Sequence, residues 1–183
     1  MSRKEIRVAG FGGQGVVMLG NIVGKAASIF EKGNAALTQS YGPESRGGSC
    51  VAEVVISDEP IDYPYVTSPK VQIILSQEAY TKYGQNPPPG TLVIVDSDLV
   101  KVAPNQKPQP LSIPVSRIAR EELGRPVVAN IIMLGFLAAT SDMVSSEALK
   151  NSVLDSIPAG TESINTRAFE LGYNYGIEHS RKD

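Results

Sequence analysis

The sequence is poor in the side chains that bind metals and clusters. Its 183 residues include one cysteine, one histidine and no tryptophan. A single cysteine cannot form an internal disulfide, which favours the cytoplasm. A 4Fe–4S cluster takes about four thiolates and a structural zinc site about four Cys or His ligands, so this chain cannot hold either alone. The one histidine, His179, lies in the last predicted helical turn, where a Ser–His–Asp or Cys–His catalytic arrangement is not expected.

Long apolar runs and an excess of one charge are also missing. The longest apolar stretch, 127–139, is interrupted by Asn130 and Gly135, and about 20 apolar residues are needed to span a bilayer. The net charge is −2, with both signs spread along the chain, so no nucleic-acid surface or basic membrane anchor is indicated. The first residues run straight into a predicted strand, without a signal peptide. We therefore expect a cytoplasmic protein that binds neither nucleic acid nor membranes.

The length fits one domain, which we expect to span residues 1–183. Short apolar runs predict strands at residues 6–9, 35–38, 50–56, 71–75 and 92–95. Helical periodicity and helix-start signals predict helices at residues 14–30, 77–83, 116–123, 131–139, from Ser145 or Ser146 onward, and at 166–179. This alternation indicates an α/β fold, a Rossmann-like three-layer domain with a mainly parallel sheet.

Individual residues add local predictions. Gly20 and Gly24 lie close to the apolar face of the first helix, which suggests a close approach to the sheet, and Gly33 is expected to cap the end of that helix. Asn130 is expected to cap the helix that follows it. The proline-rich segment 101–114 is expected to be an extended surface connection.

A glycine-rich turn follows the first predicted strand. Gly10, Gly12 and Gly15 match the G-x-G-x-x-G pattern between a strand and a helix, where free backbone amides can bind an anion. A dinucleotide site usually has an acidic residue about 20 residues further on, but segment 35–39 contains none, and no Gly-Lys-Ser/Thr follows for a P-loop. Two interpretations remain: the glycines permit a tight turn, or the turn binds a phosphate or another anionic group.

A second glycine loop, residues 39–48, carries several groups capable of binding. Arg46 can grip a phosphate or carboxylate with two hydrogen bonds, Ser45 adds a small donor, and Gly47 leaves the backbone open. Tyr41 lies in the same loop. If the sheet is parallel, the loop leaves at the edge where open α/β sheets bind ligands, so both glycine loops could face one pocket. The alternative is a loop ordered only by its own contacts.

Other polar residues are interpreted structurally. Cys50 begins a strand between apolar neighbours and is expected to be a buried small side chain. Asp96 and Asp98 end a strand, where two carboxylates most often form a turn.

Five motifs in series then resemble the gamma subunit of 2-oxoacid:ferredoxin oxidoreductases, over nearly the whole chain. They are GFGGQGV at 10–16, QSYGPESRGG at 39–48, ISDEPI at 56–61, NIIMLG at 130–135 and NTRAFELG at 165–172. The spelling of the second and third motifs is most similar to the 2-oxoglutarate type. The pyruvate, 2-oxoisovalerate and indolepyruvate types share much of it, so pyruvate and 2-oxoisovalerate stay as alternative substrates.

The resemblance implies the activity of a larger complex. Such enzymes convert a 2-oxoacid, CoA and oxidised ferredoxin to acyl-CoA, carbon dioxide and reduced ferredoxin, using thiamine diphosphate, Mg²⁺, 4Fe–4S clusters and CoA. The gamma chain is expected to bind none of these cofactors alone, to be inactive alone, and to lie near the CoA site. Its partners would be the alpha and beta chains, with a delta chain in some members, and ferredoxin through the complex. The isolated chain, with its partner surface open, could self-associate as a homodimer.

The resemblance and the two glycine loops together select candidate site residues, and no catalytic or metal-binding residue is expected. The candidates for contact with CoA or a partner chain are Gly12, Gly13, Gln14, Gly15, Tyr41, Ser45, Arg46 and Gly47. Two other classes of function stay open: a pure assembly module whose glycines serve only packing, and a free-standing nucleotide-binding protein.

Overall fold

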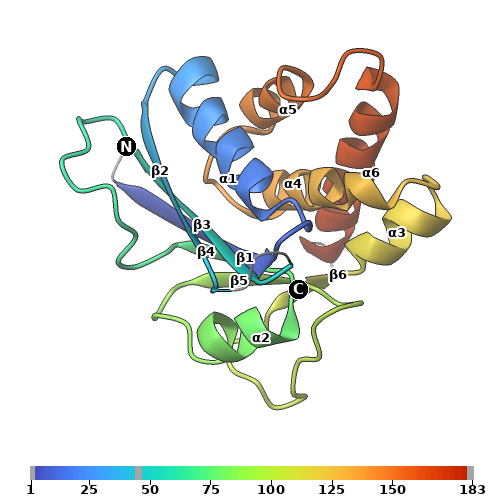
Figure 1. Ribbon diagram of the computed structural model, residues 1–183, viewed down its shortest axis with the longest axis horizontal. Coiled ribbons are helices and arrows are strands. Elements are labelled where there is room, and N and C mark those ends of the chain that lie inside the picture. The colour runs from blue at the N-terminus through green and yellow to red at the C-terminus, as the bar shows by residue number, and fades with distance from the viewer. Residues whose placement is uncertain (1–2, 44–46, 181–183) are drawn as a thin grey trace.

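The computed structural model (Figure 1) describes residues 3–43 and 47–180. In these ranges six strands form one sheet in the order β2-β3-β1-β4-β5-β6. The strands are β1 (Lys4–Phe11), β2 (Asn34–Tyr41), β3 (Ser49–Ser57), β4 (Val71–Ile74), β5 (Leu92–Asp96) and β6 (Leu111–Ile113). β1, β4, β5 and β6 pair in parallel with one another in that order, whereas β3 is antiparallel to both β1 and β2. The predicted α/β fold with a mainly parallel sheet is confirmed.

Helices cover both faces of the sheet (Figure 1). They are α1 (Val16–Lys25) with a π-helical turn η1 (Ala26–Phe30), α2 (Gln77–Ala79) with a π-helical turn η2 (Tyr80–Gly84), α3 (Val115–Glu121), the 3-10 helix η3 (Pro126–Val128), α4 (Ala129–Thr140), α5 (Ser146–Leu154) and α6 (Glu162–Ser180). Side chains alternate between the two faces of the sheet along β1, so this strand contributes to two cores. Ile6 and Val8 pack in the large core with α1 and α4, and Ala9 packs in the small core with Tyr80. The result is the predicted three-layer arrangement.

None of the helices in the described ranges combines the length and apolar character that crossing a membrane requires.

The ends of the first helix differ from the prediction. It begins at Val16, later than predicted, because Gly15 adopts a left-handed φ of 77° and serves as the N-cap. At the other end Lys32 has the positive φ, 58°, so the predicted cap at Gly33 was wrong by one residue. The Gly33 amide instead donates to the Ala27 carbonyl at 3.0 Å.

Three elements differ from the prediction: β2 and α6 are longer than expected, and β6 was not predicted. β2 continues to Tyr41, so the connection to β3 spans only residues 42–48. The end of β2 was missed because its residues are polar, and an edge strand buries little of its surface. β6 lies inside the segment predicted as an extended connection, and α6 begins at Glu162 instead of Thr166.

Glycines allow two close contacts between elements. The predicted approach of α1 to the sheet is confirmed: a Cβ at Gly20 would lie 3.0 Å from Ala52 Cβ. The crossing of α4 and α6 is closer still. A Cβ at Gly135 would overlap the Phe169 carbonyl oxygen, and a Cβ at Gly172 would overlap that of Ile132. The backbones of these two helices therefore touch directly.

We predict that Gly172→Ala lowers the free energy of unfolding by about 1–3 kcal/mol, because the added methyl forces the two helices apart. Gly24→Ala is the matched control. Its Cβ would meet Val54 Cγ1 at an ordinary 3.6 Å, and alanine in a helix is favoured by up to about 1 kcal/mol. Urea denaturation of both variants measures the difference, and equal stability of the two would contradict the close contact.

Candidate functional site

The two glycine loops meet at the carboxyl end of β1. The Gly12 amide donates to the Gly48 carbonyl at 2.9 Å, and a Cβ at Gly12 would lie 3.5 Å from Gly47 Cα. β2 runs in the same direction as β1, since β3 is antiparallel to both. The second loop therefore leaves at the edge that the sequence predicted, and its backbone packs against the first turn.

The side chain of Gln14 holds this turn in place. Its Oε1 accepts from the Phe11 amide at 2.6 Å, and its Nε2 donates to the Leu75 carbonyl at 2.8 Å. Gln14 thus joins the end of β1 to the residue that follows β4. Its role is to position the turn.

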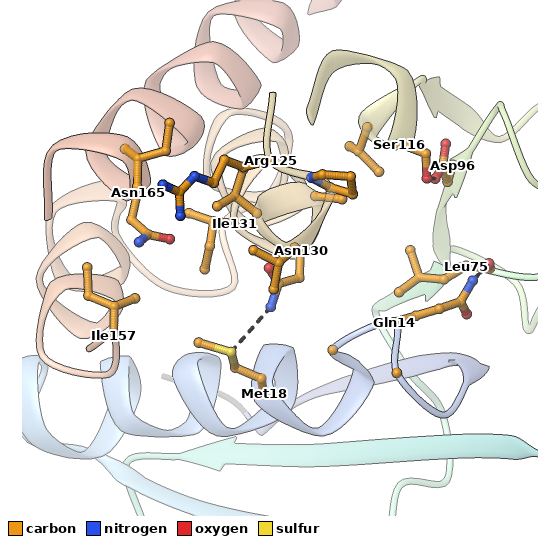
Figure 2. Close-up of a pocket in the computed structure, with 18 of the residues that line it drawn as sticks. Gln14, Met18, Leu75, Asp96, Ser116, Arg125, Asn130, Ile131, Ile157 and Asn165 are labelled. Atoms are coloured by element: carbon orange, nitrogen blue, oxygen red, sulfur yellow. Dashed lines mark hydrogen bonds between the residues drawn. The ribbon is translucent and has the colours of Figure 1, made fainter. Parts of the chain in front are cut away.

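Beside the turn lies a cavity of about 510 Å³ (Figure 2). Its floor is formed by Gly13, Gln14 and Gly15. Its walls come from α1, α3, α4 and α6, from the carboxyl ends of β4 and β5, and from the loops beside them. Most of the wall side chains are apolar: Met18, Leu75, Leu99, Val115, Pro126, Val127, Val128, Ile131, Ile157, Pro158 and Ile164. The polar ones are Asp96, Ser116, Arg125, Asn130, Thr161 and Asn165. This combination suits a ligand with a large neutral part and a few polar groups.

Asn130 is the site residue that sequence reasoning misjudged. It is not the N-cap of α4, because η3 starts the helical path earlier and the cap is Val128. Its side chain is 7% exposed. The Nδ2 atom lies 3.3 Å from Met18 Sδ (Figure 2), and no donor among the described residues reaches Oδ1. A buried amide oxygen without a donor is costly, so this oxygen is available to a ligand that brings an N–H or O–H group.

Asn130 also restricts the glycine turn. A Cβ at Gly15 would lie 2.7 Å from Asn130 Nδ2, in addition to the left-handed backbone at that position. The sequence signal for this pairing was the motif at 130–135, but nothing local connects it with residue 15.

The electrostatics of the cavity favour anions at one end. The first turns of α1 and α4, which carry no acidic residue, both contribute to its lining, and helix N-termini carry unpaired amides and partial positive charge. Arg125, which is exposed, adds a full positive charge beside α4. These groups together can bind a phosphate or a carboxylate.

One acidic side chain lies at the other end. Asp96 is 1% exposed, and burial raises the pKa of its carboxyl despite hydrogen bonds to it. Ser116 Oγ donates to Oδ2 at 2.6 Å and the Asp98 amide to Oδ1 at 3.1 Å. The predicted turn role of Asp96 is confirmed. Its hydrogen bond to Ser116 of α3 was not predicted from the sequence.

Among the remaining candidates that the structure describes, none lines the cavity. Tyr41 is 64% exposed at the end of β2 and does not line it. Gly47 contacts Gly12 as described, and Ser45 and Arg46 lie outside the described residues. Cys50 is 3% exposed, as predicted for a small buried side chain, and burial raises the pKa of its thiol.

Comparison with known proteins identifies the family. A model described as pyruvate ferredoxin/flavodoxin oxidoreductase matches residues 5–175. The chain belongs to this family. Within the pyruvate ferredoxin/flavodoxin oxidoreductase family, it is similar to the protein named 2-oxoglutarate synthase subunit KorC of Methanocaldococcus jannaschii. The two are 49% identical over 178 residues, which cover 96% of this chain and 95% of that protein.

Solved structures agree with this assignment. The keto/oxoacid ferredoxin oxidoreductase gamma subunit from Geobacter sulfurreducens PCA matches with 38% identity and a TM-score of 0.87, covering 97% of this chain and 98% of that chain. The 2-oxoglutarate:ferredoxin oxidoreductase from Magnetococcus marinus, with 2-oxoglutarate, coenzyme A and succinyl-CoA bound, shares the fold at 24% identity and a TM-score of 0.82. It covers 96% of this chain, which matches only 31% of that longer chain. The family resemblance of the sequence is confirmed, including its likeness to the 2-oxoglutarate type.

The raised pKa of Asp96 predicts a pH-dependent stability. Because the folded protein disfavours the ionised carboxyl, the stability associated with Asp96 is largest at low pH and is lost as pH rises through the raised pKa. Asp96→Asn removes this dependence. We predict that its stability relative to the wild type increases between about pH 4 and pH 7, as measured by urea denaturation at each pH.

Ser116→Ala serves as the opposing control. It removes a hydrogen bond that favours the ionised form of Asp96, so its stability relative to the wild type should decrease over the same pH range. Parallel pH profiles for all three proteins would refute the assignment.

Proposed function

We propose that this chain is the gamma subunit of a thiamine-diphosphate-dependent 2-oxoglutarate:ferredoxin oxidoreductase. The observation that carries this proposal is its 49% identity, over nearly the full length of both chains, to a subunit of 2-oxoglutarate synthase. The enzyme would convert 2-oxoglutarate, CoA and oxidised ferredoxin to succinyl-CoA, carbon dioxide and reduced ferredoxin, in the cytoplasm. Pyruvate and 2-oxoisovalerate are the alternative substrates.

The redox chemistry belongs to the partner chains in this proposal. The clusters that reduce ferredoxin are typically held by thiolates, and this sequence offers one cysteine, which is buried in the core. Its residues therefore do not fit a cluster. Thiamine diphosphate with Mg²⁺ would supply the carbon chemistry from the alpha and beta chains.

The contribution of this chain would be to bind part of CoA. That molecule combines phosphate groups with a long neutral pantetheine arm and a planar adenine. The cavity offers matching groups: backbone amides at Gly13 and Gly15, the cation of Arg125, and apolar walls. Asn130 Oδ1 could accept a hydrogen bond from an amide or amino group of the ligand. By its residue type, Arg46 of the second loop could add a phosphate contact.

Reconstitution tests the proposed function. The alpha and beta chains, with a delta chain where the enzyme has one, are assayed with and without this chain for CoA-dependent viologen reduction. The substrates are 2-oxoglutarate, pyruvate and 2-oxoisovalerate. We expect no activity from this chain alone and highest activity with 2-oxoglutarate when it is present. Full activity of the partner chains without this chain would contradict the proposal. A preference for another oxoacid would change the assigned substrate.

Two single variants test the role in CoA binding. Arg46→Ala and Arg125→Ala, each in the reconstituted enzyme, are expected to raise the KM for CoA about tenfold, since a charge-assisted hydrogen bond contributes about 1.5–3 kcal/mol. Arg120→Ala is the matched control, because Arg120 is exposed on α3 and does not line the cavity. Unchanged KM values in both test variants would favour a pure assembly role for this chain.

A further inference from the structure

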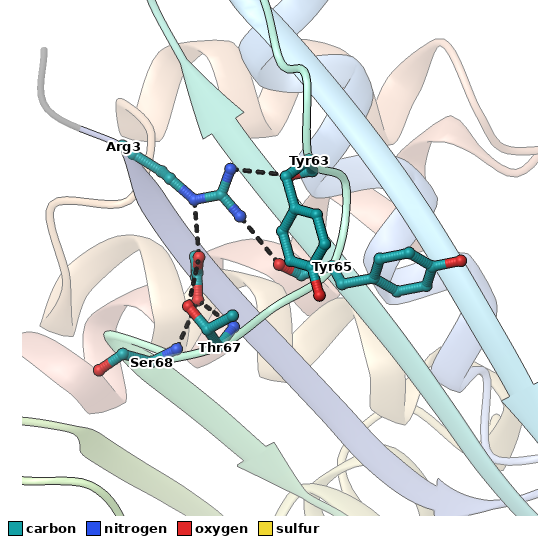
Figure 3. Close-up of polar contacts among 6 residues, drawn as sticks. Arg3, Tyr63, Tyr65, Thr67 and Ser68 are labelled. Atoms are coloured by element: carbon teal, nitrogen blue, oxygen red, sulfur yellow. Dashed lines mark hydrogen bonds and ion pairs between the residues drawn. The ribbon is translucent and has the colours of Figure 1, made fainter.

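The segment between β3 and β4 lies at the end of the sheet opposite the glycine turn (Figure 3). Two residues hold it there as a polar clasp: Arg3, which precedes β1, and Glu5 of β1. Arg3 donates to the carbonyls of Tyr63 and Tyr65, at 2.8 Å each, and pairs with Glu5 at 2.7 Å. Glu5 accepts from the Thr67 amide and from the amide of residue 68, at 2.7 Å each. The segment is ordered without belonging to a helix or strand.

Glu5 stays ionised near neutral pH. Burial raises the pKa of Glu5, but the hydrogen bonds from Ser68, Arg3 and Thr67 outweigh burial, and the net pKa is lowered. The Arg3 charge is correspondingly engaged with a carboxylate and two carbonyls.

The clasp presents two tyrosines to solvent. Tyr63 and Tyr65 are each 55% exposed, and their ring centroids lie 5.3 Å apart at an interplanar angle of 59°. The next residue, Val66, is 9% exposed and anchors the segment in the protein. Ordering a loop that exposes a tyrosine pair lowers the conformational cost of binding a partner, and tyrosine is enriched among the residues that dominate interface energies.

The charged residues within the segment itself have one sign. Segment 57–69 contains Asp58, Glu59 and Asp62 and no lysine or arginine. Glu59 and Asp62 are exposed. The exposed carboxylates of Glu59 and Asp62 favour a partner that brings positive charge. Arginine is suited to this role because guanidinium groups both pair with carboxylates and stack on aromatic rings.

We infer that the tyrosine clasp, defined as residues 58–68 with Arg3 and Glu5, is the docking surface for an arginine-bearing face of a larger subunit of the same enzyme. This inference rests on the proposed function. In the Magnetococcus marinus protein the matching fold is 31% of one longer chain, so a separate chain with this fold needs a noncovalent surface to do what fusion does there.

A second copy of this chain is a poorer occupant. A two-fold contact centred on the clasp would place the same surface against itself. Glu59 and Asp62 of one copy would then face those of the other, and like charges across an interface are unfavourable.

The experiment measures the Kd for binding of this chain to the purified complex of its partner subunits. The double variant Tyr63→Ala/Tyr65→Ala is expected to raise the Kd about tenfold or more, as central aromatic residues of interfaces do. Asp62→Lys is expected to raise it as well, and to weaken the salt dependence of binding. Ile29→Ala is the control, since Ile29 is a large apolar side chain that is 62% exposed elsewhere.

The outcomes separate this inference from the proposed function. At saturating concentrations of the tyrosine variant, the KM for CoA should equal that of the wild type, because only docking is affected. Binding of the wild type with an unchanged Kd for the tyrosine variant would overturn the inference alone, as would equal weakening by Ile29→Ala. Dimerisation of the isolated wild type, abolished in the tyrosine variant, would assign the surface to a second copy. Failure of the wild type to bind any partner would overturn both.

Thermal melting of each isolated variant completes the design. The two rings are exposed, so the tyrosine variant should keep the wild-type Tm. A lowered Tm with weakened binding would assign the clasp a structural role and overturn the docking inference.

Discussion

The direct backbone contact between α4 and α6 is the constraint on which the cavity depends. α4 is buried along most of its length, so it has no free face on which to adjust its position. Gly135 and Gly172 let α6 press against it without intervening side chains. The first turn of α4 is thereby held beside the first turn of α1, and α6 closes the third side of the cavity.

Much of the fold followed from local patterns in the sequence. Three features each depend on neighbouring residues: the G-x-G-x-x-G turn, the apolar strands β4 and β5, and the N-cap of α5 at Ser145. Ser145 does accept from the Ala148 amide at 3.2 Å. The misses have a common cause. β6 is a short strand defined by its pairing with β5, and the end of β2 is polar, so both depend on partners that are distant in sequence.

The candidate site was predicted less completely, for the same reason. The sequence placed the glycine turn at a ligand-binding edge and paired it with the second loop, and the contact of Gly12 with Gly48 agrees. It did not indicate Arg125, or the pairing of Ser116 with Asp96, because these residues meet only after α3 and α4 have packed. Asn130 resembled a helix cap because it precedes an apolar run. The 3-10 turn that begins at Pro126 starts the helical path earlier, so Asn130 lies inside the first turn of α4 and lines the cavity.

β1 links the two ends of the molecule, with the tyrosine clasp at its start and the glycine turn at its end. It pairs with β3 over eight residue pairs, which is about 26 Å of chain at roughly 3.3 Å per residue. Inserting one residue here would turn Ile6 and Val8 to the opposite face of the sheet. The alternation of its side chains therefore sets the length of β1, and with it the separation of the two surfaces.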